Sequence, residues 1–258
     1  MSMMTEAFSA FIYGIVIGLL SLIPASPELP GLGEVPKLYF SLLPAAYLGS
    51  LVAFMFYFRE EISRGTFMAV RGTSWGELKY VVLTALITLI IGIPLSRVEA
   101  SWRILLSVNI ISALLLLVMG AKLPSSALLR ELEESMQEKP TPLDAFLAGV
   151  SQGLSAIQGI SRSGLVALFL LPLGHDGKRL LRLSFEAAPA YLVVKILTTG
   201  WSPLSPKWLG PVTFTSAFFA TSLGIWGLMR LSEKIETGRF IVLYGLLGVL
   251  VSLVGVIL

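Results

Sequence analysis

The chain has 258 residues, of which 55% are hydrophobic and only 14% are charged, and its formal net charge is +3. A soluble domain is about one quarter charged, so this composition excludes an ordinary soluble domain and favours an integral membrane protein with basic loops at the membrane surface. The lack of cysteine excludes disulfides and thiolate ligands, the single histidine excludes a histidine-rich metal site, and no stripe of basic and aromatic residues indicates a nucleic-acid partner.

Eight long apolar segments follow one another along the chain, and their hydrophobic runs are continuous rather than alternating. They lie at residues 6–23, 37–58, 79–95, 102–121, 143–172, 181–199, 209–230 and 238–258. A helix needs about 20 mainly apolar residues to cross a bilayer. Lipid cannot hydrogen-bond backbone groups, so a spanning segment must be a helix or part of a closed barrel, and continuous apolar runs indicate helices. We therefore predict an all-α, multi-pass protein of the cell membrane, with polar loops at 59–78 and 123–142.

Two of these segments resemble each other. Residues 14–26 read GIVIGLLSLIPAS, and residues 149–161 read GVSQGLSAIQGIS. At an offset of 135 residues, identical residues occur at four pairs of positions: Gly14/Gly149, Gly18/Gly153, Leu19/Leu154 and Ser26/Ser161. We interpret the chain as a single membrane domain over 1–258, made of two inverted repeats, about 1–122 and 143–258, joined by the polar loop 123–142.

Both similar segments lose their apolar character at glycine, proline and serine residues. Interrupted hydrophobic segments at corresponding positions of two halves indicate a binding site in membrane proteins. Irregular backbone at membrane depth is stable only when it is buried in protein or lines a wet cavity. Residues 6–36 and 143–172 are therefore predicted to form broken, re-entrant helix pairs whose tips meet at a central polar site.

The second break, QGISRSGL at 158–165, has the chemistry of an anion site. Arg162 offers a planar fork of donors that suits phosphate oxygens, although an arginine at the bilayer centre costs about 2.5–3.5 kcal/mol on insertion scales. Ser161 and Ser163 add hydroxyl groups. Gly159 and Gly164 let the backbone approach a ligand, and a helix that begins here would add a positive dipole end. The alternative is a loop tip whose arginine extends to the membrane interface.

This stretch resembles the second signature motif of the undecaprenyl-diphosphate phosphatase family. The matching residues are Gln152, Ala156, Gly159, Ser161, Arg162, Ser163, Gly164, Ser184, Phe185 and Pro189. The resemblance implies a helical membrane protein with two inverted repeats, each with a re-entrant helix pair. It also implies that the protein removes the terminal phosphate from a C55 polyprenyl diphosphate, which Arg162 and its two neighbouring serines would hold. Gln158 stands where the family has proline.

The first signature motif of that family is only partly present in this chain. Gly14, Gly18, Pro24 and Ser26 match, whereas the two family glutamates and the histidine fall on Ile17, Ser21 and Pro30. An isoleucine cannot do acid–base work, so a second interpretation stays open beside the phosphatase. In that interpretation the protein binds and translocates a polyprenyl phosphate or another anionic lipid without hydrolysis.

Two carboxylates are candidates to replace the missing acids. Glu28 follows the first break, and Glu186 lies within an apolar segment, where an ionisable residue indicates a functional site. Either could act as the base or as a ligand of a divalent cation, Mg²⁺ or Ca²⁺, while Ser26, Ser161, Ser163 or water attacks the phosphorus. Alternatively, Glu28 is a solvated loop charge, and Glu186 forms a structural ion pair with Lys195 or Arg162. The expected partners are the bilayer and a polyprenyl (di)phosphate; a homodimer is a further candidate assembly.

Overall fold

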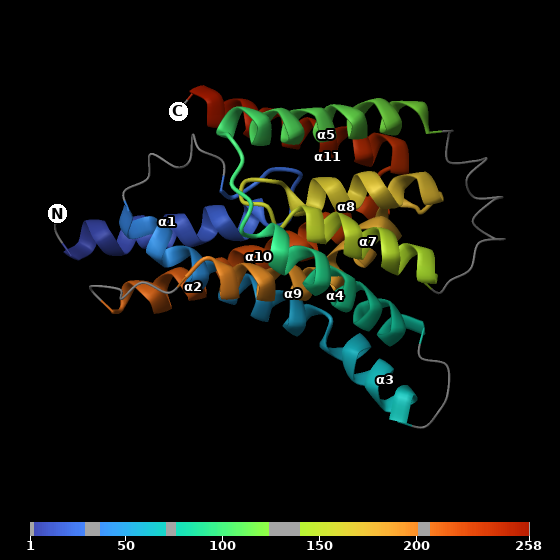
Figure 1. Ribbon diagram of the computed structural model, residues 1–258, viewed down its shortest axis with the longest axis horizontal. Helices are drawn as coiled ribbons and strands as arrows, with labels where there is room; N and C mark the ends of the chain where they lie inside the picture. The colour runs from blue at the N-terminus through green and yellow to red at the C-terminus, as the bar shows by residue number, and fades with distance from the viewer. Residues whose placement is uncertain (1–2, 29–36, 71–75, 124–139, 201–206, 258) are drawn as a thin grey trace.

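The computed structural model describes residues 3–28, 37–70, 76–123, 140–200 and 207–257 (Figure 1). Within these ranges all regular structure is helical, which confirms the predicted fold class. The helices are α1 (Met3–Leu20), α2 (Lys37–Tyr57), α3 (Arg59–Val70), α4 (Gly76–Leu95), α5 (Trp102–Lys122), α7 (Pro142–Leu154), α8 (Arg162–Leu170), the 3-10 helix η2 (Leu171–Leu173), α9 (Gly177–Thr198), α10 (Leu209–Lys234) and α11 (Thr237–Ile257).

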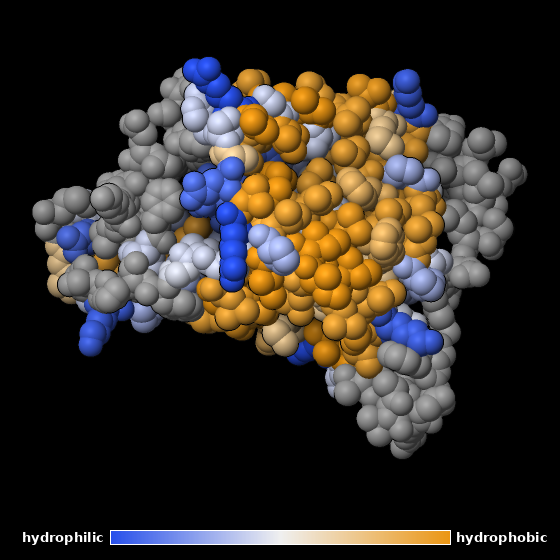
Figure 2. All heavy atoms as spheres, in the orientation of Figure 1, coloured by the Kyte–Doolittle hydropathy of each residue, from blue (hydrophilic) through white to orange (hydrophobic). Residues whose placement is uncertain are grey.

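Five helices, α1, α4, α5, α10 and α11, are long and apolar enough to cross a membrane. Large apolar side chains on them point outward: Ile90 of α4 is 72% exposed and Leu223 of α10 is 67% exposed. Figure 2 shows a continuous hydrophobic surface over the middle of one face, with hydrophilic side chains toward its margins. Exposed apolar surface of this extent is expected for a protein whose solvent is lipid.

The largest departure from the predicted elements is α3, which occupies part of the predicted loop 59–78. Glu60 and Glu61 lie in its first turn, where a negative charge interacts favourably with the helix dipole. Arg64 lies 3.4 Å from Glu60 one turn earlier, an (i, i+4) ion pair. The second predicted loop, 123–142, falls largely outside the described residues, and the division into two halves there stays a prediction.

The helices pack in a two-fold pattern. Helix α1 packs on α10 as α7 packs on α4, and α2 packs on α10 as α9 packs on α4. Helices α2 and α9 pack on each other, and so do α5 and α11. Exchanging α1 with α7, α2 with α9, α4 with α10 and α5 with α11 leaves these pairings unchanged. This symmetry supports a duplication, while the inverted orientation of the halves in the membrane stays a prediction.

The glycines shared by the two similar segments occupy corresponding contacts. A Cβ on Gly14 of α1 would lie 2.5 Å from the carbonyl oxygen of Thr213 in α10. A Cβ on Gly149 of α7 would lie 2.7 Å from Cβ of Ile87 in α4. Small residues let membrane helices approach closely enough for van der Waals contact to hold them together. The matching glycines therefore mark the same helix–helix contact in each half.

The second predicted helix pair is present as α7 and α8. Thr141 and Asp144 form a capping box at the start of α7, and Pro142 occupies the first helical position. The chain breaks between 155 and 161, and α8 then returns along α7, so that the outer ends of both helices lie on the same side of the molecule (Figure 1). The first segment can be followed to residue 28, and the rest of that predicted pair lies outside the described residues.

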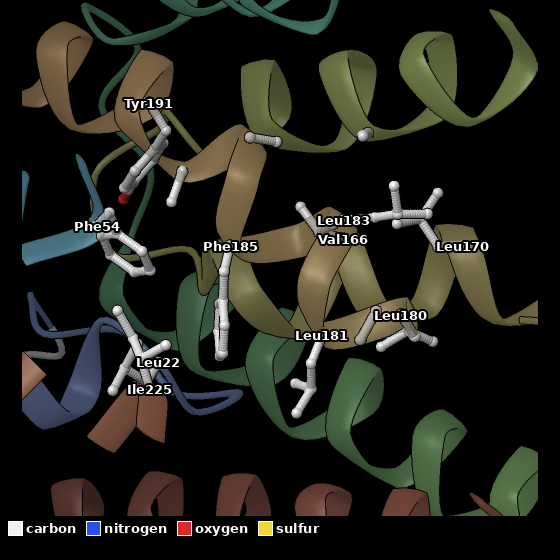
Figure 3. Packing of buried hydrophobic residues seen from close by; sticks show 14 of the residues in the cluster. Leu22, Phe54, Val166, Leu170, Leu180, Leu181, Leu183, Phe185, Tyr191 and Ile225 are labelled. Carbon is white, nitrogen blue, oxygen red and sulfur yellow. The ribbon is translucent and has the colours of Figure 1, made fainter. Parts of the chain in front are cut away.

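An aromatic cluster supports the centre of the molecule. Figure 3 shows Phe54 of α2 near Phe185 and Tyr191 of α9, with Leu22 and Ile225 beside them. The Phe54 and Phe185 ring centres are 5.7 Å apart, a separation typical of favourable aromatic pairs. This cluster fixes α2 against α9 beside the two breaks.

Candidate phosphate site

Arg162 lies at the beginning of α8 and is only 4% exposed. Its Nη1 donates to the carbonyl oxygen of Ser184 and its Nη2 to that of Ser21, both at 2.8 Å, and its guanidinium carbon lies 5.5 Å from the Phe54 ring centre. In the described part of the chain, no carboxylate forms an ion pair with Arg162. Its charge is therefore balanced only by carbonyl dipoles and an aromatic face, which leaves the buried site electrostatically suited to an anion.

The three carbonyl groups that follow α1 all point to donors from elsewhere. Ser21 accepts from Arg162, Leu22 accepts from the Tyr244 hydroxyl at 2.6 Å, and Ile23 accepts from the Ser163 hydroxyl. The donors come from the second break and from α11, so they tie the chain that follows α1 to both places. The first break thus supplies acceptors, and the second break supplies donors.

The motif loop before Arg162 is held by its own residues. The Ser161 hydroxyl accepts the N–H of Gly164 at 3.2 Å and caps α8. Gly159 has φ of 91°, which is a left-handed conformation that side chains rarely adopt. A Cβ on Gly164 would lie 3.1 Å from Cβ of Pro24, so the start of α8 packs directly on the first break. The predicted meeting of the two breaks is therefore observed.

Asn109 of α5, which the sequence did not single out, fixes the same loop from outside. Its Oδ1 accepts the N–H of Ser161 and its Nδ2 donates to the carbonyl oxygen of Gly159, both at 2.7 Å. Asn109 is fully buried. The signal that could have found it is a lone amide in a strongly apolar helix, because polar side chains inside a membrane mark functional or packing sites.

Glu28 contacts the loop from the first break, and it is not a solvated loop charge. Its Oε2 accepts the Gly159 N–H at 2.9 Å and forms an ion pair with Lys195 at 2.8 Å, while its Oε1 accepts the Tyr47 hydroxyl at 2.7 Å. The Glu28 and Lys195 side chains are 2% and 4% exposed. The Ser26 hydroxyl accepts the Glu28 N–H at 3.2 Å and shapes this turn. Glu28 thus joins the first break to both the motif loop and α9.

Two predicted site residues lie elsewhere. Gln152 of α7 accepts from the Thr88 hydroxyl of α4 at 3.3 Å, and no hydrogen bond joins it to Arg162. Glu186 of α9 forms an ion pair with Arg182 at 2.7 Å, rather than with Lys195 or Arg162 as the sequence suggested. The structure therefore groups Gly159, Ser161, Arg162, Ser163 and Gly164 with Ser26 and Glu28, and separates Gln152 and Glu186 from them.

The two candidate acids, Glu28 and Glu186, do not form a binding site for a divalent cation. Glu28 already balances the Lys195 ammonium, and Glu186 is engaged by the Arg182 guanidinium. Within the described residues, no three acidic or histidine side chains gather at one point. Mg²⁺ and Ca²⁺ bind carboxylate oxygens together with carbonyl or water oxygens, whereas both of these carboxylates are bound to cationic side chains, so neither has the surroundings of an Mg²⁺ or Ca²⁺ ligand.

The positions of the missing family acids have different roles here. Ile17 is 2% exposed and lies in the hydrophobic core. The Ser21 hydroxyl donates to Gly18 at 2.7 Å, and its carbonyl group, not its side chain, meets Arg162. Pro30 falls outside the described residues. The first break therefore meets Arg162 through its backbone.

Comparison with known proteins identifies the family of this chain. The model of the bacitracin resistance protein BacA family matches residues 10–250. The chain belongs to the BacA family. Its match spans both breaks, all of α4, α5 and α10 and most of α1 and α11, and it makes the chain an integral, multi-pass membrane protein. The resemblance inferred from the motif at 153–164 is confirmed.

Relatives in the BacA family align over nearly their whole length. Proteins named undecaprenyl-diphosphatase from Methanococcoides burtonii and Haloarcula marismortui are each 29% identical to this chain, over 96% and 95% of it and 98% and 97% of their own lengths. A protein of the same name from Saccharolobus solfataricus is 28% identical, over 95% of this chain and 94% of its own length.

Proposed function

We propose that this protein removes the terminal phosphate of a polyprenyl diphosphate and so recycles a lipid carrier of the cell membrane. The observation that carries the proposal is Arg162, a buried cation without a carboxylate partner in the described chain, at the beginning of a helix in the family's phosphate motif. The names of the full-length relatives support the same activity. The predicted homodimer is not needed for this proposal.

Arg162 provides the electrostatic part of the reaction. A guanidinium has five N–H donors, and two of those of Arg162 are used by Ser184 and Ser21. The remaining guanidinium donors and the positive end of the α8 dipole form a preorganised set that suits an anion. When water attacks the terminal phosphorus, the bridging P–O bond breaks and the lipid monophosphate leaves with the electron pair. Fixed donors that stabilise this charge lower the barrier.

Glu28 is the carboxylate that we assign to the attacking water. It contacts the Gly159 N–H and therefore lies beside the loop that precedes Arg162. Because Lys195 balances its charge, the site keeps one net positive charge from Arg162. As proton acceptor, Glu28 would take the proton that water loses, in place of the carboxylates absent at Ile17 and Ser21.

Release of inorganic phosphate from undecaprenyl diphosphate by the purified protein tests the proposal. We expect turnover by the unchanged protein, about a hundredfold or greater loss with Arg162→Ala, and a comparable loss with Glu28→Gln. Arg230→Ala is the matched control, because Arg230 is an exposed arginine of α10 that lies over Trp226. Specific, Arg162-dependent binding of the lipid without any phosphate release would instead support the translocating alternative.

A further inference from the structure

Beside the phosphate site lies an apolar cavity that the mechanism above does not use. It encloses about 190 Å³ between α2, α3, α4 and α9. Its apolar walls are formed by Met55, Phe58, Ile62, Leu78, Val81 and Pro189. Met55 and Ile62 are 49% and 36% exposed, so the cavity reaches the molecular surface beside them.

The cavity and the phosphate site share a wall. The Phe54 ring lines the cavity and also lies 5.5 Å from the guanidinium carbon of Arg162. Helix α9 contributes to both places as well, because Ser184 accepts a hydrogen bond from Arg162 and Pro189 lines the cavity. Figure 3 shows Phe54 packed with Phe185 and Tyr191. A ligand with an anionic head at Arg162 would therefore have its next apolar atoms beside this cavity.

The two carboxylates of the cavity are paired with an arginine at its rim. Glu186 and Glu61 line the cavity, and Arg182 lies 2.7 Å from Glu186 and 4.0 Å from Glu61. A carboxylate next to apolar surface is expensive unless it is paired, so Arg182 makes the rim compatible with an apolar guest.

We propose that this cavity binds the first isoprene units of the diphosphate lipid. This assignment rests on the proposed function for the identity of the head group. Pockets that hold a whole small ligand enclose about 300–1,000 Å³, so a cavity of 190 Å³ takes only the head-proximal part of a long chain. The rest of the chain leaves past Met55 and Ile62 into the bilayer. Branched, apolar isoprene units match walls made of aromatic and aliphatic side chains.

The first test compares substrates with and without an isoprenoid part. Val81→Phe narrows the cavity, and Ile90→Phe is the control, since Ile90 lies on the same helix, is 72% exposed and lines no part of the cavity. For farnesyl diphosphate we expect kcat/KM to fall about tenfold with Val81→Phe, equivalent to about two methylene groups left unburied. Hydrolysis of methyl diphosphate should be unchanged. Equal losses for both substrates would overturn the assignment.

A second test needs no variant and no turnover. The unchanged protein in phospholipid vesicles is irradiated with a farnesyl diphosphate analogue that carries a benzophenone on its first isoprene unit, and the labelled peptides are mapped. Labelling of residues 54–62 and 78–81, removed by excess farnesyl diphosphate but not by added phospholipid, supports the assignment. Labelling only elsewhere, for example in the groove of α1 and α10 around Phe11 and Phe219, overturns it. Labelling of the cavity in a protein that releases no phosphate would refute the proposed hydrolysis alone.

Discussion

The two breaks occupy corresponding places in the repeat but carry opposite charges. At the offset of 135 residues, Ser26 corresponds to Ser161, Pro27 to Arg162 and Glu28 to Ser163. Both serines use the side-chain oxygen to accept a following backbone N–H, that of Glu28 in the first break and that of Gly164 in the second. The shared serine therefore binds the backbone that follows it in both breaks. The residues beside it decide which sign of charge the break presents.

Each break also supplies a hydrogen-bond partner to the backbone of the other. Arg162 reaches from the second break to the carbonyl group of Ser21, and Glu28 reaches from the first break to the N–H of Gly159. These contacts join residues more than 130 positions apart, so each break contributes to holding the other in place. The lesson is that a duplicated segment can diverge into complementary halves of one site while both copies keep a serine that binds the backbone after it.

The largest effect should come from separating Glu28 from Lys195. Lys195→Met leaves a buried carboxylate without its cation, and we expect the free energy of unfolding to fall by about 3–5 kcal/mol. Chemical denaturation in detergent micelles measures this change. The double variant with Glu28→Gln should lose less than the sum of the two single variants, because neither buried charge then remains.

The control for this pair is the half-exposed ion pair of Lys178 and Glu233, 2.8 Å apart. Lys178→Met should change the stability little, since water and salt screen such pairs. Strictly additive losses for Glu28→Gln and Lys195→Met would contradict a coupled buried pair, and the link between the first break and α9 would then lie in other contacts.

The second effect concerns the shape of the cation at the other break. Arg162→Lys keeps a positive charge but replaces a planar fork that holds Ser21 and Ser184 together. We expect kcat for phosphate release to fall about 10²–10³-fold while the protein remains folded. Arg230→Lys on the exposed face of α10 serves as the reference. Nearly full activity with lysine at 162 would mean that charge alone is sufficient.

The sequence predicted the surroundings of Arg162 better than those of Glu28, for a physical reason. The donors of the second break are consecutive residues, 159–164, so one stretch of sequence contains most of the motif. The partners of Glu28 come from three other elements: Tyr47 of α2, Gly159 of the loop and Lys195 of α9. No local pattern encodes that convergence, which only the packing of the helices creates.

The helices themselves were predictable because lipid demands long, continuous apolar runs. The helix α3 was missed, since its stability comes from charge placement in a polar stretch rather than from apolar length. Glu186 shows a different limit at the site. Its position in an apolar segment indicated an ion-pair partner, and the sequence suggested Lys195 or Arg162. The partner is Arg182, which the (i, i+4) spacing on α9 indicates, whereas Lys195, nine residues after Glu186, points away from it.

The third effect tests whether the second break depends on support from α5. Asn109→Leu removes both hydrogen bonds to the loop and leaves the Ser161 N–H and the Gly159 carbonyl group buried without partners. We expect a loss of about 1–3 kcal/mol for each unpaired group, and reduced phosphate release because Arg162 is less well positioned. Ser107→Ala on the exposed side of α5 is the control. Unchanged stability with Asn109→Leu would show that water or the loop itself replaces these bonds.

The smallest effect concerns the backbone conformation of the second break at Gly159. Gly159 has φ of 91°, and a Cβ there would lie 2.8 Å from Cδ1 of Leu105, so Gly159→Ala should lower the stability by about 1–2 kcal/mol. Gly227→Ala in α10 should instead leave the stability unchanged or raise it by up to about 1 kcal/mol, because nothing lies within 4 Å of its added methyl group. Thermal unfolding of both variants measures the contrast.

The repeat counterpart of Gly159 is Pro24, whose ring fixes φ near −65°. The two breaks therefore reach their shared serine through different backbone conformations, and a neutral Gly159→Ala variant would show that the left-handed turn is not required for the second one.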